Sequence, residues 1–191
     1  MKNIAVTITV ALWASAAFGT SIGLFSTPDC SSCSLKVLSG NAATLYVRAS
    51  TNGLPTNESL TTANFKIVGL PQGWFAFLTP NPETFTTGDP FGAIGATITF
   101  RSDSQRGTCI DLGSATLIAT SPVQDWVLRV TGSTPPPNPR FPCPLIVVIC
   151  SDRACDTIYC AEGGELLVNA NTDCNVGVEM KSWGEVRNLY R

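Results

Sequence analysis

The chain has 191 residues, a formal net charge of −2 and a hydrophobic content of 44%. Its lysines and arginines form no run, which argues against nucleic acids and anionic membrane surfaces as partners, because both need clustered positive charge. The chain contains no histidine. Ser-His-Asp and Cys-His hydrolysis are therefore excluded.

The first nineteen residues predict a secretory signal peptide. Lys2 gives a cationic start, an apolar run follows from Ile4 to Ala17, and Ala17-Phe18-Gly19 forms a small-residue cleavage site. The apolar run is shorter than the roughly 20 residues that a membrane-spanning helix needs. We therefore expect cleavage near Gly19, no transmembrane segment after cleavage, and a single exported domain over residues 20–191.

All eight cysteines lie beyond the expected cleavage site. They are Cys30, Cys33, Cys109, Cys143, Cys150, Cys155, Cys160 and Cys174. An even number of cysteines in an exported chain predicts disulfides and leaves no spare thiol for a nucleophile. Zinc is the alternative, because Cys30 and Cys33 have the spacing of zinc ligands.

Short alternating segments between residues 41 and 132 predict an all-β fold. Apolar and polar residues alternate over 45–49, 64–67, 97–101 and 126–131, which is typical of half-buried strands. The segments 74–78 and 115–119 are apolar on both faces, and we expect them to be central strands. The pattern favours a two-sheet immunoglobulin-like sandwich of eight or nine strands.

A proline-rich connector, residues 133–142, precedes a Cys-rich hairpin region, residues 143–174. We expect the connector to cross between the sheets, with a ligand for a proline-reading module as the alternative. A hairpin with its loop at 151–154 would bring Cys150 opposite Cys155 and Cys143 near Cys160. If all cysteines are oxidised, at least one of the last five must bond to one of the first three, which would tie this region to the sandwich.

The C-terminal residues predict a short helix over 182–190. Ser182 and Glu185 have the spacing of a capping box, and Trp183, Val186 and Tyr190 fall on one helical face. The helix would either cover one end of the sandwich or serve as a docking or sorting tail.

The chain resembles two groups of proteins. The segments 64–74, 79–82, 141–145, 163–165 and 178–190 together resemble a set of uncharacterised small secreted proteins of uncultured bacterial lineages, and this resemblance implies no activity or site. The motif Gly69-Leu70-Pro71-Gln72-Gly73-Trp74 between two strands is similar to parts of bacterial cohesin-like and immunoglobulin-like sandwiches. That resemblance implies a sheet face that binds a partner protein, and it assigns no binding residue.

The candidate site residues are aromatic or acidic. Trp74, Phe75 and Trp126 are a possible ligand platform, and the alternative for Trp74 is a place in the core. Calcium could bind at Asp103 with Asp111, or at Asp152 with Asp156, although polar turn residues are the better explanation of both pairs. The acids are otherwise scattered along the chain, so we predict no catalytic residue, cofactor site or metal site.

The sequence thus favours an exported, non-enzymatic interaction or surface-associated structural module. Its expected partner is an extracellular protein or polysaccharide. The alternatives are a carbohydrate-binding module and, third, a secreted carboxylate-dependent hydrolase. An exposed aromatic strip would favour a sugar ligand, and an apolar patch would favour a protein partner.

Overall fold

The structure, a computed structural model, describes residues 19–171 apart from 53, 102–104, 138–139, 141 and 151–155. The predicted C-terminal helix, Cys155, Cys174 and all of the predicted signal peptide except Gly19 lie outside the described residues. In the described part of the chain, no helix is long and apolar enough to cross a bilayer.

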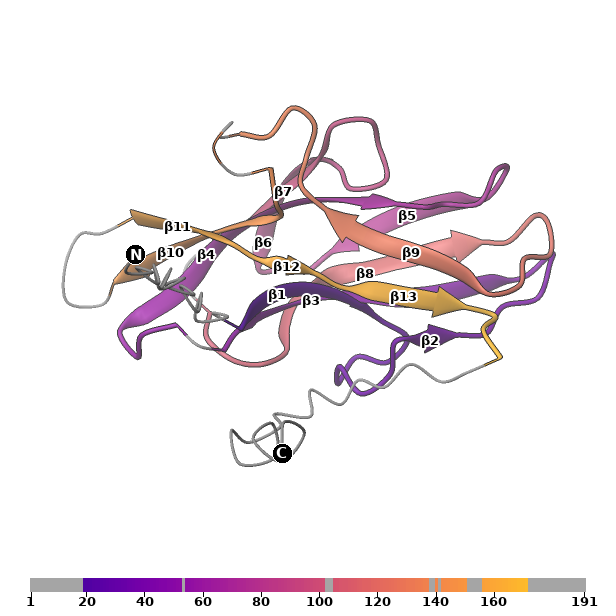
Figure 1. Cartoon of the computed structure of the whole chain (residues 1–191), viewed down its shortest axis with the longest axis horizontal. Helices are drawn as coiled ribbons and strands as arrows, with labels where there is room; N and C mark the ends of the chain where they lie inside the picture. Colours follow the sequence, from indigo (N-terminus) through magenta and orange to yellow (C-terminus); the bar gives the residue numbers. More distant parts are fainter. Residues whose placement is uncertain are drawn as a thin grey trace, which may run out of the picture.

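The described residues form thirteen strands in two facing sheets (Figure 1). The five-stranded sheet has the order β12-β1-β3-β8-β5. Its strands are β1 (Thr20–Phe25), β3 (Ala42–Thr51), β5 (Phe75–Pro80), β8 (Ile110–Ile118) and β12 (Glu162–Gly163).

The eight-stranded sheet has the order β11-β10-β4-β9-β13-β2, and β7 pairs with both β4 and β6. Its strands are β2 (Ser34–Leu35), β4 (Glu58–Val68), β6 (Thr84–Asp89), β7 (Gly95–Phe100), β9 (Trp126–Thr131), β10 (Leu145–Cys150), β11 (Asp156–Cys160) and β13 (Glu165–Val168). The fold is thus an all-β two-sheet sandwich, as the alternation predicted.

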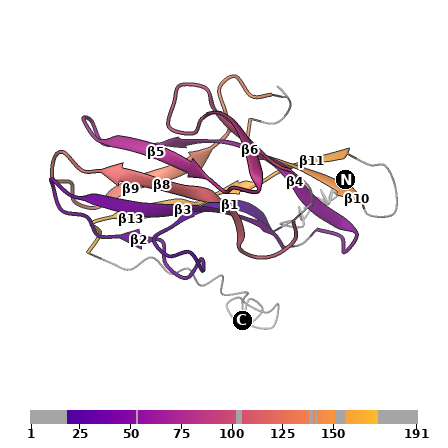
Figure 2. The same ribbon diagram turned by 180° about the vertical axis from the view of Figure 1, so that it is seen from behind.

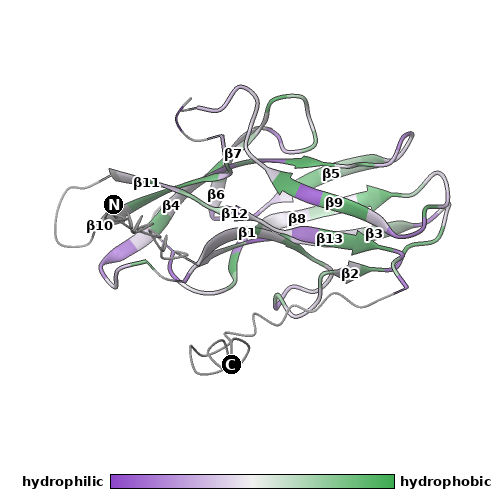
Figure 3. Ribbon diagram, viewed as in Figure 1, coloured by the Kyte–Doolittle hydropathy of each residue, from purple (hydrophilic) through white to green (hydrophobic). Residues whose placement is uncertain are grey.

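The core lies between the inner faces of the two sheets. Alternate residues of β3, among them Leu45 and Val47, are fully buried, and so is Phe65 of β4 on the opposite side. This is the arrangement that a period of two along a strand produces. Figure 3 shows hydrophobic segments in strands of both sheets.

Two details of the predicted sandwich are wrong. The strand count of eight or nine is too low, partly because β2 and β12 have two residues each and are too short to show alternation. The segment 74–78 is not a central strand, because β5 lies at the end of the five-stranded sheet. Its outward side chains are apolar although no other strand of the described chain covers them.

The Cys-rich region is built into the same two sheets. The strand β10 pairs with both β11 and β4, while β12 lies parallel to β1, and β13 lies parallel to β2 and antiparallel to β9. The antiparallel pairing of β10 with β11 confirms the predicted hairpin. The predicted proximity of Cys143 and Cys160 is confirmed by a disulfide, whereas the expected pairing of Cys150 with Cys155 involves a residue outside the described ones.

The proline-rich connector does not cross between the sheets. It leaves β9 and leads to β10, and both strands pair with β4 in the eight-stranded sheet. This is possible because β4 is 11 residues long. Its last residues, Lys66–Val68, bond to β9, and its earlier residues bond to β10.

Candidate functional site

The edge strand β5 presents aromatic side chains on the outer face of the five-stranded sheet. Phe75 is 55% exposed and Phe77 is 58% exposed, while Ala76 and Leu78 between and beyond them pack against the core. Successive side chains of a strand point to opposite faces. The sequence Phe-Ala-Phe-Leu therefore places both phenylalanine rings on the outside.

The neighbouring strand β8 adds a third apolar side chain to this face. Ile118 is directly opposite Phe75 in the antiparallel ladder and is 37% exposed. Directly opposed side chains of a sheet lie about 5 Å apart at Cβ, and side chains two residues apart along one strand about 7 Å. Phe75, Phe77 and Ile118 are thus contiguous, and we call them the apolar patch. Figure 2 shows β5 and β8 side by side, with β5 at the border of the sheet.

The outer face becomes more polar away from β5. Thr116 of β8 is opposite Phe77 on one side and Thr44 of β3 on the other. In the next row, Ser114 is opposite Tyr46. The apolar patch is therefore bordered on this side by the hydroxyl side chains of Thr116 and Thr44.

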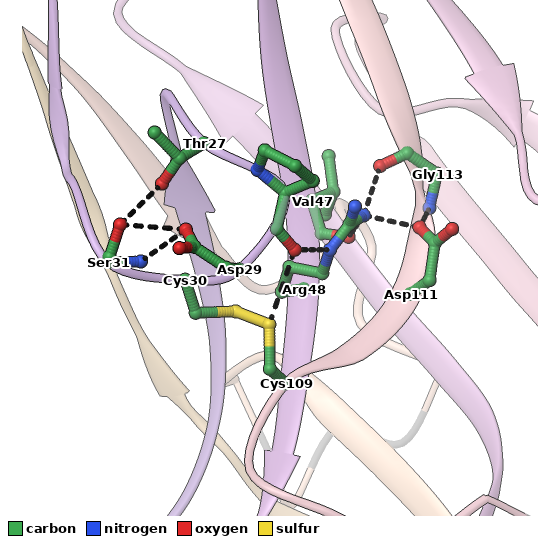
Figure 4. Close-up of a disulfide and its surroundings, with 10 residues drawn as sticks. Thr27, Asp29, Cys30, Ser31, Val47, Arg48, Cys109, Asp111 and Gly113 are labelled. Carbon is green, nitrogen blue, oxygen red and sulfur yellow. Dashed lines mark hydrogen bonds and ion pairs between the residues drawn. A yellow bond between two sulfur atoms is a disulfide. The ribbon is translucent and has the colours of Figure 1, made fainter.

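The opposite end of this face is closed by a loop that a disulfide holds in place (Figure 4). Cys30 bonds to Cys109 and draws the loop that contains Pro28 over β3. The carbonyl of Pro28 accepts a hydrogen bond of 3.2 Å from Nε of Arg48. This end of the sheet is therefore covered by the chain itself.

Arg48 is the buried cation beneath that loop, with 7% of its side chain exposed. Its Nη1 donates to the carbonyls of Val47 and Gly113 and forms an ion pair with Asp111. A register shift between Val47 and Arg48 gives β8 an extra residue at this point, and such a bulge re-aims a side chain. The bulge and the loop together satisfy a guanidinium that would otherwise be costly to bury.

The described groups with shifted pKa values do not suggest acid catalysis. Hydrogen bonds associated with the hydroxyls of Thr27 and Ser31 and with the Ser31 amide lower the pKa of Asp29 to about 2. A general acid needs a raised carboxyl pKa, which is the opposite shift. The pKa of Tyr159 is raised, first by burial and then by Glu58, which accepts a hydrogen bond of 2.8 Å from its hydroxyl.

The three residues predicted as a platform do not come together. Trp74 is 4% exposed, and its indole N–H donates to the Ser121 carbonyl over 2.9 Å, so the alternative of a place in the core is confirmed. Trp126 lies on β9 in the other sheet, where its indole N–H donates to the Gly69 carbonyl. Phe75 is the member of the predicted set that belongs to the apolar patch.

The sequence analysis did not identify Phe77 or Ile118. The signal that could have found Phe77 is the period of two itself, because Trp74 and Phe75 are adjacent and must face opposite sides, whereas Phe75 and Phe77 must share a side. Ile118 belongs to the patch because of the register between β5 and β8, and one sequence contains no comparable signal for it.

The proposed metal-binding residues are only partly described. Asp111 is engaged by Arg48, Asp103 and Asp152 lie outside the described residues, and the side chain of Asp156 is not described. The described residues contain no group of three His, Cys, Asp or Glu side chains that could hold a metal. Cys30 and Cys33 are both in disulfides, which excludes zinc binding by this pair, and the described residues do not test the calcium alternative.

Comparisons with known proteins give similarity at the level of architecture. No family model and no curated protein matches the chain. A cohesin module from a Clostridium perfringens family 33 glycoside hydrolase has 13% identity and a TM-score of 0.48, with 80% of this chain and 99% of that chain covered. A non-cellulosomal cohesin from Archaeoglobus fulgidus has 12% identity and a TM-score of 0.47, with 78% and 90% covered.

A further similar chain comes from a type I cohesin–dockerin complex of Clostridium thermocellum. It has 7% identity and a TM-score of 0.46, with 78% of this chain and 98% of that chain covered. At such identities and scores we transfer no residue role and no partner to this protein. The resemblance to small secreted bacterial proteins stays a prediction. The described chain is a disulfide-bonded two-sheet sandwich, and the solved structures named here, to which it is similar, are two cohesin modules and a cohesin–dockerin complex.

Proposed function

We propose that the protein is an exported, non-enzymatic interaction module that binds a protein partner on the apolar patch. The observation that carries the proposal is the contiguous exposure of Phe75, Phe77 and Ile118 on one sheet face. Single exposed apolar residues are ordinary, whereas contiguous apolar patches are often functional and, when large, mark interaction sites.

The patch has the composition of an interface centre. Aromatic side chains dominate the energy of many protein interfaces, and burying one Phe or Ile completely is worth about 1.5–3 kcal/mol. The surrounding hydroxyl side chains of Thr44 and Thr116 could form the polar rim that such centres have.

Export is supported by the disulfides. Cys30 with Cys109 and Cys143 with Cys160 are bonded, and bonds of this kind form and persist in oxidising compartments. They agree with the signal peptide that the first nineteen residues predict. The partner would therefore be met outside the cytoplasm.

A carbohydrate ligand is the second candidate, because two exposed rings stand in one row on β5. Sugar binding also needs directed hydrogen bonds to the sugar hydroxyls. Phe75 and Phe77 have no polar atom in their side chains. Phe75 is paired with the aliphatic Ile118, and Phe77 is paired with Thr116, which offers a single hydroxyl. These features favour a protein surface over a sugar.

The test places a photo-reactive phenylalanine analogue at position 77 of the full chain in the producing cells. The control carries it at position 85, where Phe85 of β6 is 60% exposed and lies against Arg101. We expect one protein to cross-link from position 77 and not from position 85. The purified partner should then bind the Phe75→Asp variant at least about tenfold more weakly, since 1.4 kcal/mol corresponds to a factor of ten.

Two results would contradict the proposal. One is equal cross-linking from positions 77 and 85, and the other is undiminished partner binding by Phe75→Asp. Binding to a panel of polysaccharides that the Phe75→Asp change abolishes would replace the protein partner with a sugar.

A further inference from the structure

We propose that two copies of this chain pair through the free edge of β5. The two strands would run antiparallel about a two-fold axis at Phe77 and join two five-stranded sheets into one continuous sheet. This inference goes beyond the proposed function, although it involves the same strand.

The free edge of β5 lacks the usual protection against pairing. On one side β5 bonds to β8, and in the described chain no strand bonds to its other side. Sheet edges are normally protected by charged side chains, prolines, bulges or a covering loop, and the one such feature within β5 is Pro80 at its last residue. The sequence of β5 is Phe-Ala-Phe-Leu-Thr-Pro, which contains no charge, and its register with β8 runs without a shift.

The hydrogen bonds around β8 show which groups of β5 point outward. Asn81 donates its amide to the Leu112 carbonyl, one position beyond the ladder in the same register. Bonded positions alternate along an antiparallel strand, so Phe75, Phe77 and Thr79 bond to β8. Ala76, Leu78 and Pro80 therefore direct their backbone groups to the free edge.

The bonds on the other side of β8 agree with this assignment. Ala119 donates its amide to the Asn41 carbonyl over 3.0 Å, on the side of β3. Near the C-terminal end of β8, the backbone groups of odd-numbered residues therefore bond to β3, and those of even-numbered residues bond to β5.

The outward groups of β5 are self-complementary. With Ala76 of one copy opposite Leu78 of the other, each such pair exchanges two N–H to carbonyl bonds, and the two-fold axis supplies the second pair. All four outward N–H groups then have acceptors. Pro80 has no N–H and falls beyond the paired residues, whereas a shift of two residues would place it opposite Ala76 and lose donors.

The same register pairs the exposed side chains of the two copies. Phe77 faces Phe77 of the second copy across the axis, and Phe75 faces Thr79. Opposed aromatic side chains stabilise a strand pair, and no like charges meet. Beside this edge lies a groove of about 330 Å³ between β5 and β6, and its lining includes Phe77 and Pro80 of β5 and Asp89 of β6.

The experiment measures the mass of the exported full chain in solution by sedimentation equilibrium. We expect a dimer whose dissociation constant rises at least tenfold in Phe77→Lys, which brings two cations together at the axis, and in Ala76→Pro, which removes an outward N–H and no bond to β8. Phe85→Lys is the matched control and should dimerise like the wild type. Thermal unfolding shows whether each variant folds. If Ala76→Pro fails to fold, the dissociation constant of Phe77→Lys alone tests the dimer.

A wild-type chain that stays monomeric up to its solubility limit would overturn the inference. So would a dimer that persists in both folded variants. A monomer that still cross-links to another protein from position 77 would leave the proposed function standing while the dimer fails. A dimer that cross-links from position 77 to its own copies alone would support the inference and contradict the proposed function.

Discussion

Arg48 connects a loop and two strands through one guanidinium. It bonds to Pro28 of the loop, to Val47 of its own strand and to Gly113 and Asp111 of β8. Removing the buried guanidinium leaves the carbonyls that it bonds without this donor, and an unsatisfied buried acceptor costs more than the bond itself contributes. Asp111 is 49% exposed and keeps access to water. Arg48 therefore matters for the stability of the covered end of the sheet and not for the apolar patch.

We expect Arg48→Met to lower the free energy of unfolding by about 2–4 kcal/mol. The control is Arg129→Met, because Arg129 forms a 2.6 Å ion pair with Glu165 while its side chain is 59% exposed. Exposed pairs contribute about 0–1 kcal/mol. Urea unfolding under non-reducing conditions compares the two variants, and equal losses would contradict the account of Arg48.

The carboxyl of Asp29 should have a pKa of about 2 instead of its ordinary value of 3.8, because Thr27 and Ser31 stabilise its charged form. The folded pKa lies below the unfolded one, so its contribution to stability is present above pH 3.8 and is lost as the pH falls through about 2. Carbon NMR of the Asp29 carboxyl gives the midpoint. In Thr27→Val the midpoint should rise toward 3.8, and an unchanged midpoint would contradict this cause.

At the scale of single residues, the sequence predicted the aromatic character of the site better than it predicted which side chains are exposed. The burial of Trp74 was one of two alternatives, and Phe75 was named for the site although its partners in the patch were not. The residue type of an outward apolar side chain does not reveal whether another strand covers the side chain or leaves it exposed. The distinction depends on the order of strands in the sheet, which one sequence does not contain.

The turn before β5 is an element whose geometry depends on a glycine. Gly69 has φ of +89°, and a Cβ at this position would collide with the Val127 carbonyl of β9. Its own carbonyl accepts the indole N–H of Trp126. The end of β4 therefore packs against β9 with no room for a side chain.

Gly69→Ala should lower the free energy of unfolding by about 2–4 kcal/mol, because the cost of a left-handed alanine adds to that of the collision. Gly40→Ala is the control, because Gly40 has φ of +85° and nothing lies within 4 Å of an added Cβ. There the loss should be about 1–2 kcal/mol, which is the backbone cost alone. Thermal unfolding of both variants measures the difference, and equal losses would show that Gly69 is limited by φ and not by space.

Among the elements, strands with alternation, a continuous apolar run or a hairpin loop signal were predicted, whereas others, such as β6 and β12, were not. The segments in β3, β4, β7 and β9 were found from their period of two. The strand β6 has one large apolar residue, Phe85, in Thr-Phe-Thr-Thr-Gly-Asp, and β12 has two residues. Such strands form because their neighbours supply bonding partners, and this is a property of the assembled sheets.

At the scale of the molecule, the disulfides predict one more connection. Cys33 is disulfide-bonded, and the bonds of Cys30 to Cys109 and Cys143 to Cys160 use four other cysteines. Within one chain, the remaining candidates all belong to the Cys-rich region. Peptide mapping without reduction should find Cys33 joined to a peptide from that region.

Cys174 is the expected partner of Cys33, because Leu167 of β13 donates its amide to the Cys33 carbonyl and Cys174 follows β13 closely in the sequence. A Cys33 peptide joined to a second molecule, or a free Cys33 thiol, would contradict the prediction. The control is the Cys143–Cys160 peptide, which the same map must contain.

The two parallel strand pairs also determine when the molecule can fold. The first strand, β1, lies beside β12, and β2 lies beside β13, so that the Val37 amide bonds to Asn169 across 132 residues of chain. Contacts of such high sequence separation slow folding, and during synthesis they must wait for the last part of the chain. The sandwich therefore cannot close while its C-terminal strands are still being made. For the export proposed above, late closure means that the chain would still be unfolded when its first residues reach the membrane.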